Sequence, residues 1–333
     1  MLNGLFGDEL AERDSSLATP LTFCTASGEA LPLDRHDLRR ALPDAGPRLC
    51  VFVHGLMSSE TVWRMRDPRC TYGELLERDR GVSPVYVRYN TGRHISTNGR
   101  ALAAGLQRLV RAWPVRVREI DLIGHSMGGL VIRSACHYAT GRATLLDRLR
   151  RRGPWPARAR RVVLLGVPNS GASLEVIANL TRAALWSVPS PVTRLIGAGL
   201  DRRSDGIKDL RWGAVLDEDW HERDPGATER PERHRVRVPR RAGYLVIAGS
   251  LADEPDVERP VLVNRLLGDA LVTSSSASGR IGDDEPALFP EVTVRLCPKV
   301  NHIALANHPE VYEQIADWWD DPAPRRARVR IGR

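Results

Sequence analysis

The feature that most constrains the fold is the segment from Gly124 to Gly129 (GHSMGG), which places a G-x-S-x-G pattern around Ser126. An apolar run at 119–123 predicts a buried strand before it, and the small residues at 127–139 predict a helix after it. A serine between glycines at a strand-to-helix turn is typical of a nucleophile elbow, which stands on a parallel sheet. We therefore expect Ser126 at the carboxyl edge of such a sheet, where the C-terminal ends of the parallel strands lie.

The rest of the chain supplies the alternation that such a sheet needs. Apolar runs predict strands at 48–53, 85–89, 161–165, 244–248 and 292–296, and helical periodicity appears at 34–42, 99–113 and 311–319. Strands that alternate with helices predict an α/β fold with a mostly parallel, doubly wound sheet.

The same pattern predicts the domain organisation. Residues 1–45 form an N-terminal extension packed on the domain, 46–320 the catalytic domain, and 321–333 a basic, solvated C-terminal tail. An insertion at about 169–242 interrupts the alternation of strands and helices. Its apolar first part predicts a helical cap or lid above the sheet.

A serine is a weak nucleophile without a base, and a histidine after the last strand is the expected partner. His302 follows that strand in a short loop, whereas His308 precedes Pro309 and suits a packing or capping role at the final helix. An acid must orient the histidine. Asp269 is our first choice, because a hydrophobic pair and a serine cluster follow it, and Asp253 is the alternative.

An oxyanion formed at the serine needs two backbone N–H donors. We expect one from Met127, directly after the serine, and one from Leu56, in the loop after the strand at 48–53. His54 lies in the same loop, where we expect it to brace the backbone and take no part in catalysis.

Composition excludes several other classes of protein. No stretch approaches the length of a membrane-spanning helix, no signal peptide is visible, and the 5 cysteines lack metal-site spacing, so we expect a cytoplasmic protein without metal or cofactor.

The 49 basic against 41 acidic residues give a net charge of +8, and only Lys208 and Lys299 are lysines. Nucleic-acid binding is a rival interpretation, but the arginines are dispersed and no nucleic-acid-binding motif is present. Contact with an anionic membrane surface is the narrower expectation.

These residues together resemble the lipase and esterase branch of the α/β hydrolases, most closely bacterial hydrolases similar to the GPI inositol-deacylase and lipase-like group. The resemblance covers roughly 48–320. Its more specific parts are a run from Arg203 to Arg211 (RSDGIKDLR), the Gly-Asp-x-Leu-Val pattern at 268–272, and the histidine pattern from Asn301 to Tyr312.

The resemblance implies an α/β-hydrolase fold, no cofactor, and hydrolysis of carboxylic esters on small or lipid-like substrates. It maps the triad acid onto Asp269 and the triad histidine onto His302. Relatives usually carry a histidine where this chain has Asn169 and Ser170, which makes a contact near the cap uncertain. An acyltransferase or a phospholipid or GPI-like deacylase would use the same triad, and a scaffold that has lost catalysis is the remaining alternative.

Overall fold

The computed structural model describes residues 2–66, 69–140, 153–172, 177, 204–221, 234–250, 288–289, 292–320 and 328–331. They form an 8-stranded sheet of order β1-β3-β2-β4-β5-β6-β7-β8. Its strands are β1 (Thr22–Cys24), β2 (Arg48–Val53), β3 (Ser83–Arg88), β4 (Glu119–His125), β5 (Ala159–Leu165), β6 (Gly243–Ser250), β7 (Thr293–Pro298) and β8 (Arg328–Ile331). Every neighbouring pair is parallel except β1 with β3.

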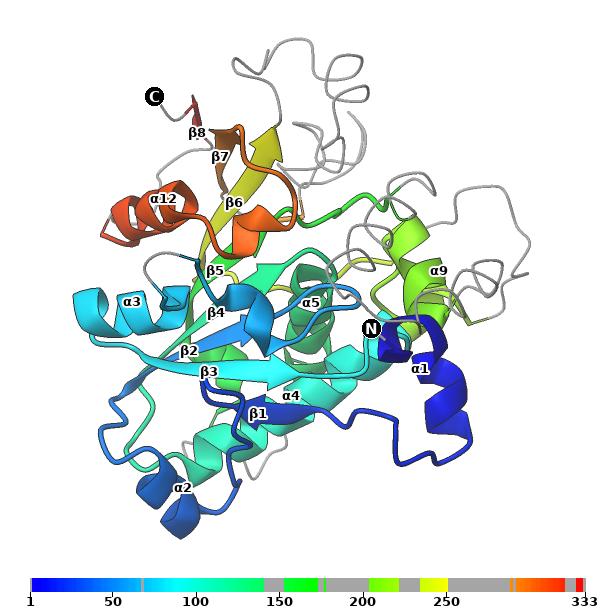
Figure 1. The fold of residues 1–333 in the computed structure, drawn as a ribbon, viewed down its shortest axis with the longest axis horizontal. Helices are drawn as coiled ribbons and strands as arrows, with labels where there is room; N and C mark the ends of the chain where they lie inside the picture. Colours follow the sequence, from blue (N-terminus) through cyan, green and yellow to red (C-terminus); the bar gives the residue numbers. More distant parts are fainter. Residues whose placement is uncertain are drawn as a thin grey trace.

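Helices cover both faces of the sheet, as the alternation predicts (Figure 1). They are α1 (Leu2–Glu12), α2 (Arg35–Ala41), α3 (Tyr72–Arg80), α4 (Ile95–Ala112), α5 (Met127–Thr140), α9 (Asp205–Trp212) and α12 (Pro309–Trp319). Short 3-10 turns accompany them: η1 (Glu60–Trp63), η2 (Trp155–Arg158), η3 (Asp217–Asp219) and η4 (Ala304–Ala306).

Two apolar cores separate the sheet from its helices. One lies under α4 and α5 and includes Leu102, Leu106 and Leu130. The other lies under α3 and α12 and includes Leu76 and Ile315. Because both faces of these central strands are buried, apolar residues run consecutively along most of β2 and the second half of β5, and β4 also buries Asp121.

The α/β class, the parallel sheet and the predicted strands are confirmed. β2 matches its predicted span, and β4 and β5 are each two residues longer than expected. The helices predicted at 34–42, 99–113, 127–139 and 311–319 correspond to α2, α4, α5 and α12. The predicted cap at 169–242 lies largely outside the described residues, which retain α9, η3 and the approach to β6.

Both terminal segments add strands that the sequence did not predict. The tail at 321–333 was expected to be basic and solvated, and within it Arg328–Ile331 pairs with β7 as the edge strand β8. The N-terminal extension supplies an edge strand, β1, and a helix, α1, that Figure 1 places beside α9, beyond the arrowheads of β2 and β3. In the part of the chain that the structure describes, no helix is long and apolar enough to span a membrane.

Candidate active site

Ser126 occupies the sharp turn between β4 and α5. Its φ of +53° is left-handed, which is uncommon for a residue other than glycine. The surrounding backbone holds this turn, because the Ser126 N–H donates to Leu165 O at 2.8 Å and its carbonyl accepts from Gly129 N at 3.0 Å. The serine is thereby fixed at the carboxyl edge of the sheet, at the N-terminus of α5.

The glycines of the elbow are required because neighbouring backbone atoms lie too close to them to leave room for a side chain. A Cβ placed on Gly128 would lie 2.2 Å from Val53 O, and one on Gly124 would lie 2.7 Å from Gly129 Cα. Both contacts are with backbone, which has no rotamer to relieve them. The G-x-S-x-G spacing therefore lets α5 pack directly against the ends of β2 and β4.

The loop after β2 lies against the serine. A Cβ placed on Gly55 would lie 2.9 Å from Ser126 Cβ, so the two residues are in direct contact. Among the described residues, neither the Leu56 N–H nor the Met127 N–H donates to another protein group. Leu56 follows Gly55 and Met127 follows Ser126, so both predicted donors adjoin this contact, and their role at an oxyanion stays a prediction.

His302 reaches the same edge from the turn after β7. A Cβ placed on Gly166, directly after β5, would lie 2.9 Å from His302 Nδ1. His125, the neighbour of the serine, donates from Nε2 to His302 O at 2.9 Å, and the two imidazole rings lie 4.9 Å apart. Since Ser126 N is bonded to Leu165 O, the serine and His302 flank the same end of β5.

The histidines around the elbow are buried, which favours their neutral forms. Burial, reinforced by His125, lowers the pKa of His302 well below its usual range. Burial also lowers the pKa of His125 to about 4 and that of His54 to about 4. A neutral imidazole can accept a proton, so His302 is in the form that a general base requires at neutral pH.

The other histidines adopt the packing roles expected of them. His54 stacks on Tyr89 at 4.5 Å, donates to Gly55 O at 2.9 Å, and accepts through its carbonyl from Tyr89 Oη at 2.8 Å. His308 occupies the N-cap position of α12, where its backbone, and not its ring, bonds to Tyr72 Oη.

Asp269, the predicted acid, and Asp253, its alternative, both lie outside the described residues, so the orienting acid stays a prediction.

Asn169, where the resemblance is weakest, is fully buried and accepts from Arg133 Nη1 at 3.1 Å. This contact ties α5 to the segment after β5.

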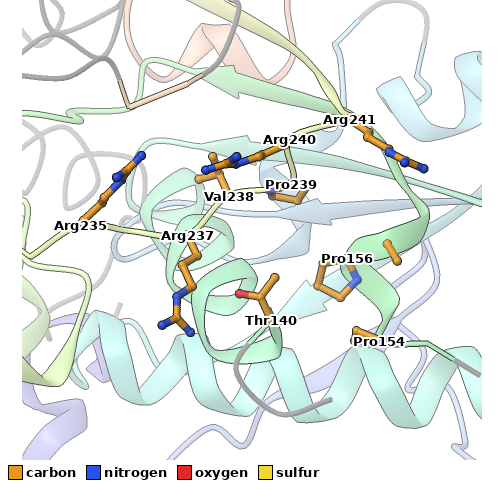
Figure 2. Close-up of a pocket in the computed structure, with 10 residues that line it drawn as sticks. Thr140, Pro154, Pro156, Arg235, Arg237, Val238, Pro239, Arg240 and Arg241 are labelled. Atoms are coloured by element: carbon orange, nitrogen blue, oxygen red, sulfur yellow. The ribbon is translucent and has the colours of Figure 1, made fainter. Parts of the chain in front are cut away.

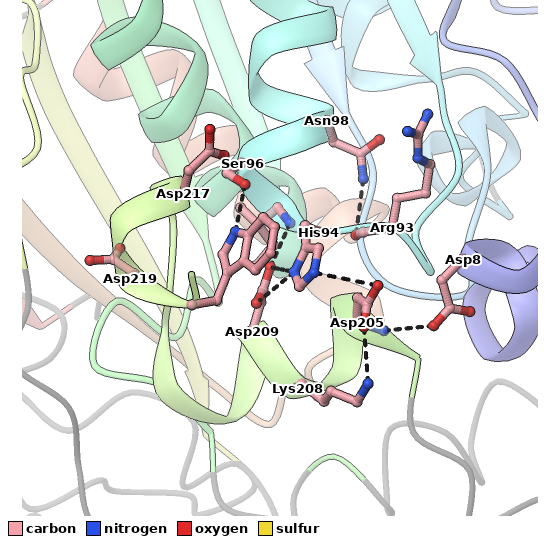
Figure 3. Close-up of polar contacts among 12 residues, drawn as sticks. Asp8, Arg93, His94, Ser96, Asn98, Asp205, Lys208, Asp209, Asp217 and Asp219 are labelled. Atoms are coloured by element: carbon pink, nitrogen blue, oxygen red, sulfur yellow. Dashed lines mark hydrogen bonds and ion pairs between the residues drawn. The ribbon is translucent and has the colours of Figure 1, made fainter. Parts of the chain in front are cut away.

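A second polar cluster, which the sequence did not reveal, joins α9 to the start of α4 (Figure 3). His94 Nδ1 lies 3.1 Å from both carboxylate oxygens of Asp209, and its Nε2 lies 3.4 Å from Asp205 Oδ2. Asp209 also accepts from Ile95 N at 2.8 Å, and Trp220 stacks on the imidazole at 3.6 Å. Burial alone would lower the pKa of His94, but the two carboxylates outweigh it and raise that pKa.

Some of the arginines line two hollows at the opposite, amino-terminal edge of the sheet. A hollow of about 770 Å³ lies where the chain enters β5 and β6, and its lining includes Arg235, Arg237, Arg240 and Arg241 (Figure 2). A neighbouring hollow of about 760 Å³, at the entries to β2 and β4, is lined partly by Arg116, Arg118 and Arg158. No carboxylate belongs to the described lining of either hollow, and neither reaches Ser126 or His302.

The described ranges contain no group of acids, histidines and cysteines that could hold a metal ion. A parallel sheet that presents a serine on a strand-to-helix elbow, beside a histidine after a later strand, defines the class of α/β hydrolases. The chain belongs to the Alpha/beta hydrolase family, whose sequence model matches residues 50–315. No curated protein matches the chain.

Solved structures share this fold at low sequence identity. The lipase BlEst2 of Bacillus licheniformis in its propeptide form is 18% identical, with a TM-score of 0.50 over 86% of this chain and 53% of the lipase. Lipase B of Aspergillus fumigatus is 8% identical, with a TM-score of 0.48 over 84% of this chain and 55% of the lipase. The chain thus spans about half the length of each lipase, and the likeness to BlEst2 establishes the fold alone.

Proposed function

We propose that the protein is a serine hydrolase that cleaves carboxylic esters through an acyl-enzyme on Ser126. The observation that carries this proposal is the left-handed Ser126, in contact with Gly55 on one side and sharing the end of β5 with His302 on the other. A nucleophile, a neutral base and two available N–H donors then meet at one edge of the sheet. Asp269 is the proposed orienting acid.

The geometry supports a two-step reaction. His302 accepts the proton of Ser126 Oγ as that oxygen attacks the ester carbonyl, and the carbonyl electron pair moves onto its oxygen. The N–H groups of Leu56 and Met127 stabilise this oxyanion, and the N-terminal end of α5 adds a favourable dipole. The tetrahedral intermediate then collapses, the alcohol departs with the proton from His302, and an acyl-serine remains.

The second step regenerates the enzyme. His302 removes a proton from water, which attacks the acyl-serine through a second oxyanion at the same two donors. Collapse of this intermediate releases the carboxylic acid, and the proton returns from His302 to Ser126 Oγ. Every proton and electron pair in this scheme is accounted for by the serine, the histidine, the ester and water.

For the substrate, we propose small or lipid-like acyl esters, the choice that the resemblance to the lipase and GPI inositol-deacylase-like group supports. An acyltransferase would follow the same first step and differ only in the acceptor. Hydrolysis rates on esters of C2 to C16 acids, measured with and without an added alcohol, distinguish these possibilities by chain-length profile and by the product formed.

The first test is Ser126→Ala. We expect the rate of p-nitrophenyl ester hydrolysis to fall at least about 1,000-fold, because the acyl-enzyme cannot form. Ser27→Ala, in an exposed turn, is the matched control and keeps the parent rate. A fluorophosphonate probe should label Ser126 in the parent, and hydrolysis at the parent rate by Ser126→Ala would exclude the proposal.

We also propose that the arginine-lined edge of the sheet contacts anionic membrane surfaces. Arg237, Arg240 and Arg241 are exposed, and no ion pair engages them within the described residues. Guanidinium groups without a carboxylate partner favour phosphate-bearing surfaces.

A further inference from the structure

The loop from His54 to Ser59 carries the Leu56 N–H. The two neighbours of Leu56, Gly55 and Met57, are held from opposite sides. On one side, Gly55 is in contact with Ser126, as described above. On the other side, Met57 has a φ of +56° and is 5% exposed. A left-handed conformation at a non-glycine residue costs about 1 kcal/mol or more and persists only where surrounding contacts impose it.

Two contacts impose it at Met57. The Met57 N–H donates to Thr91 Oγ1 at 3.1 Å, which ties the loop to the segment after β3. The second contact comes from α1. A Cβ placed on Gly4 would lie 2.3 Å from Met57 Cγ and 3.1 Å from Met57 Cα, so the backbone of α1 rests directly on Met57.

The helix α1 is itself fixed on its other side. Ser204 Oγ donates to Gly4 O at 2.7 Å, and Asp8 accepts from the Asp205 N–H at 3.1 Å, so the start of α9 is bonded to α1 at two places. Asn90 Nδ2 donates to Gly7 O at 2.8 Å, which adds an attachment to the segment after β3. Gly4, Ser204 and Asn90 are all buried.

We propose that α1 is a positioning element of the catalytic site, and that Gly4, through its contact with Met57, sets the direction of the Leu56 N–H. The inference rests on the proposed function, because it concerns the oxyanion donors of that reaction. Its physical basis is that Leu56 lies between two clamped residues. A displacement of Met57 rotates the peptide units next to it, on which the direction of the Leu56 N–H depends, while Ser126 and His302 stay in place.

The test is Gly4→Ala in the full chain. The added methyl group pushes α1 and Met57 apart, so we expect kcat for an activated ester to fall roughly 10- to 100-fold with KM nearly unchanged. Affinity for a trifluoromethyl ketone, which forms an oxyanion on the serine, should fall by a similar factor. Gly153→Ala is the matched control, because a Cβ there meets no atom within 4 Å.

A double-mutant cycle separates positioning from general destabilisation. Met57→Gly removes the side chain that the added methyl group would strike and retains freedom for a positive φ, so the Gly4→Ala penalty in kcat should largely disappear in that background. Ser204→Ala, which removes only the hydrogen bond to Gly4 O, should lower kcat several-fold without a change in KM.

Three results would overturn the inference: parent kcat in Gly4→Ala, an equal loss of kcat in Gly153→Ala, or a Gly4→Ala penalty that persists undiminished with Met57→Gly. These results are distinct from failure of the proposed function. If hydrolysis does not depend on Ser126, the proposed function fails before α1 is compared. If hydrolysis depends on Ser126 but not on Gly4, only the role of α1 is excluded.

Discussion

At the scale of single residues, three histidines lie in or beside the candidate site, and their burial favours the neutral imidazole. His54, His125 and His302 are each at most 6% exposed, and burial depresses the pKa of all three. Their roles differ, because His54 and His125 hold backbone carbonyl groups through N–H donation while His302 is the proposed base. A set of buried neutral bases makes folding sensitive to acid.

This sensitivity gives a prediction for stability against pH. In the unfolded chain these histidines take up protons below a pH of about 6.5, whereas His54 and His125 in the fold resist protonation down to a pKa of about 4. The unfolded state therefore binds more protons between these values, and stability falls as the pH falls, by up to about 3 kcal/mol for each group. We expect a steep drop in Tm between pH 6.5 and 4.

His54→Gln should make that drop shallower, because one buried titrating group is removed. His36→Gln, at an exposed position, is the control and should follow the parent curve. Thermal denaturation monitored by circular dichroism across this pH range measures both. Superimposable curves for His54→Gln and the parent, after correction for any constant offset, would contradict the prediction.

The local geometry of the candidate site was predictable where nearby sequence determines it. The elbow at Ser126 and its flanking glycines follow from a turn of a few residues, and the place of His302 follows from its position after β7, while the roles of these residues stay predictions. The left-handed backbone of Met57 was not predictable, because it depends on Gly4 and Thr91, which are remote in sequence. No periodicity or motif marks such a contact.

At the scale of elements, α9 and α4 are joined at their ends. Asp209, near the C-terminal end of α9, receives the Ile95 N–H at the first turn of α4 and both contacts from His94. His94 itself provides no side-chain cap for α4, so Asp209 performs that role from another helix. Because Asp209 belongs to α9, this cap couples the described part of the insertion to α4, which lies over the first apolar core.

Asp209→Ala should lower the free energy of unfolding by about 3 kcal/mol, because it leaves the His94 Nδ1 and the Ile95 N–H without their buried partner. Asp209→Asn keeps an acceptor for the Ile95 N–H and should lose less. Urea denaturation of the three proteins measures the difference. Equal unfolding free energies for Asp209→Ala and the parent would show that Asp209 does not stabilise this junction.

Element prediction succeeded where the hydrophobic pattern was long and regular. The six strands between β1 and β8 and helices α4 and α5 were recognisable because buried strands carry apolar runs and α4 has a clear apolar stripe. α1 was missed because Gly4 and Gly7 weaken the helical signal, although they are the residues that allow its close packing. β1 and β8 were missed because 3- and 4-residue edge strands carry little pattern.

At the scale of the whole molecule, the two edges of the sheet have different character. The carboxyl edge holds the elbow, the loop after β2 and His302, and α1 and α9 lie beyond it (Figure 1). The amino-terminal edge holds the two arginine-lined hollows. The net charge of +8 therefore includes a concentration of positive charge on the side away from the proposed chemistry.

This separation predicts that membrane contact and catalysis can be altered independently. Changing Arg237, Arg240 and Arg241 together to Gln should weaken binding to phosphatidylglycerol vesicles in a sedimentation assay, with hydrolysis of soluble esters unchanged. Changing the exposed Arg13, Arg64 and Arg93 to Gln removes the same charge from the carboxyl side of the sheet and should preserve vesicle binding. Equal losses of binding in the two variants would indicate dependence on net charge alone.

The bond from Ser204 to Gly4 links residues 200 positions apart, and it has a consequence for the order of assembly. During synthesis α1 leaves the ribosome well before α9, which fixes it in place and emerges only after β5. Contacts of such long range form late, because the chain between them must be ordered first. In refolding from denaturant, helical ellipticity should therefore return before ester hydrolysis does. The time between the two signals then measures how long α1 takes to reach its final position.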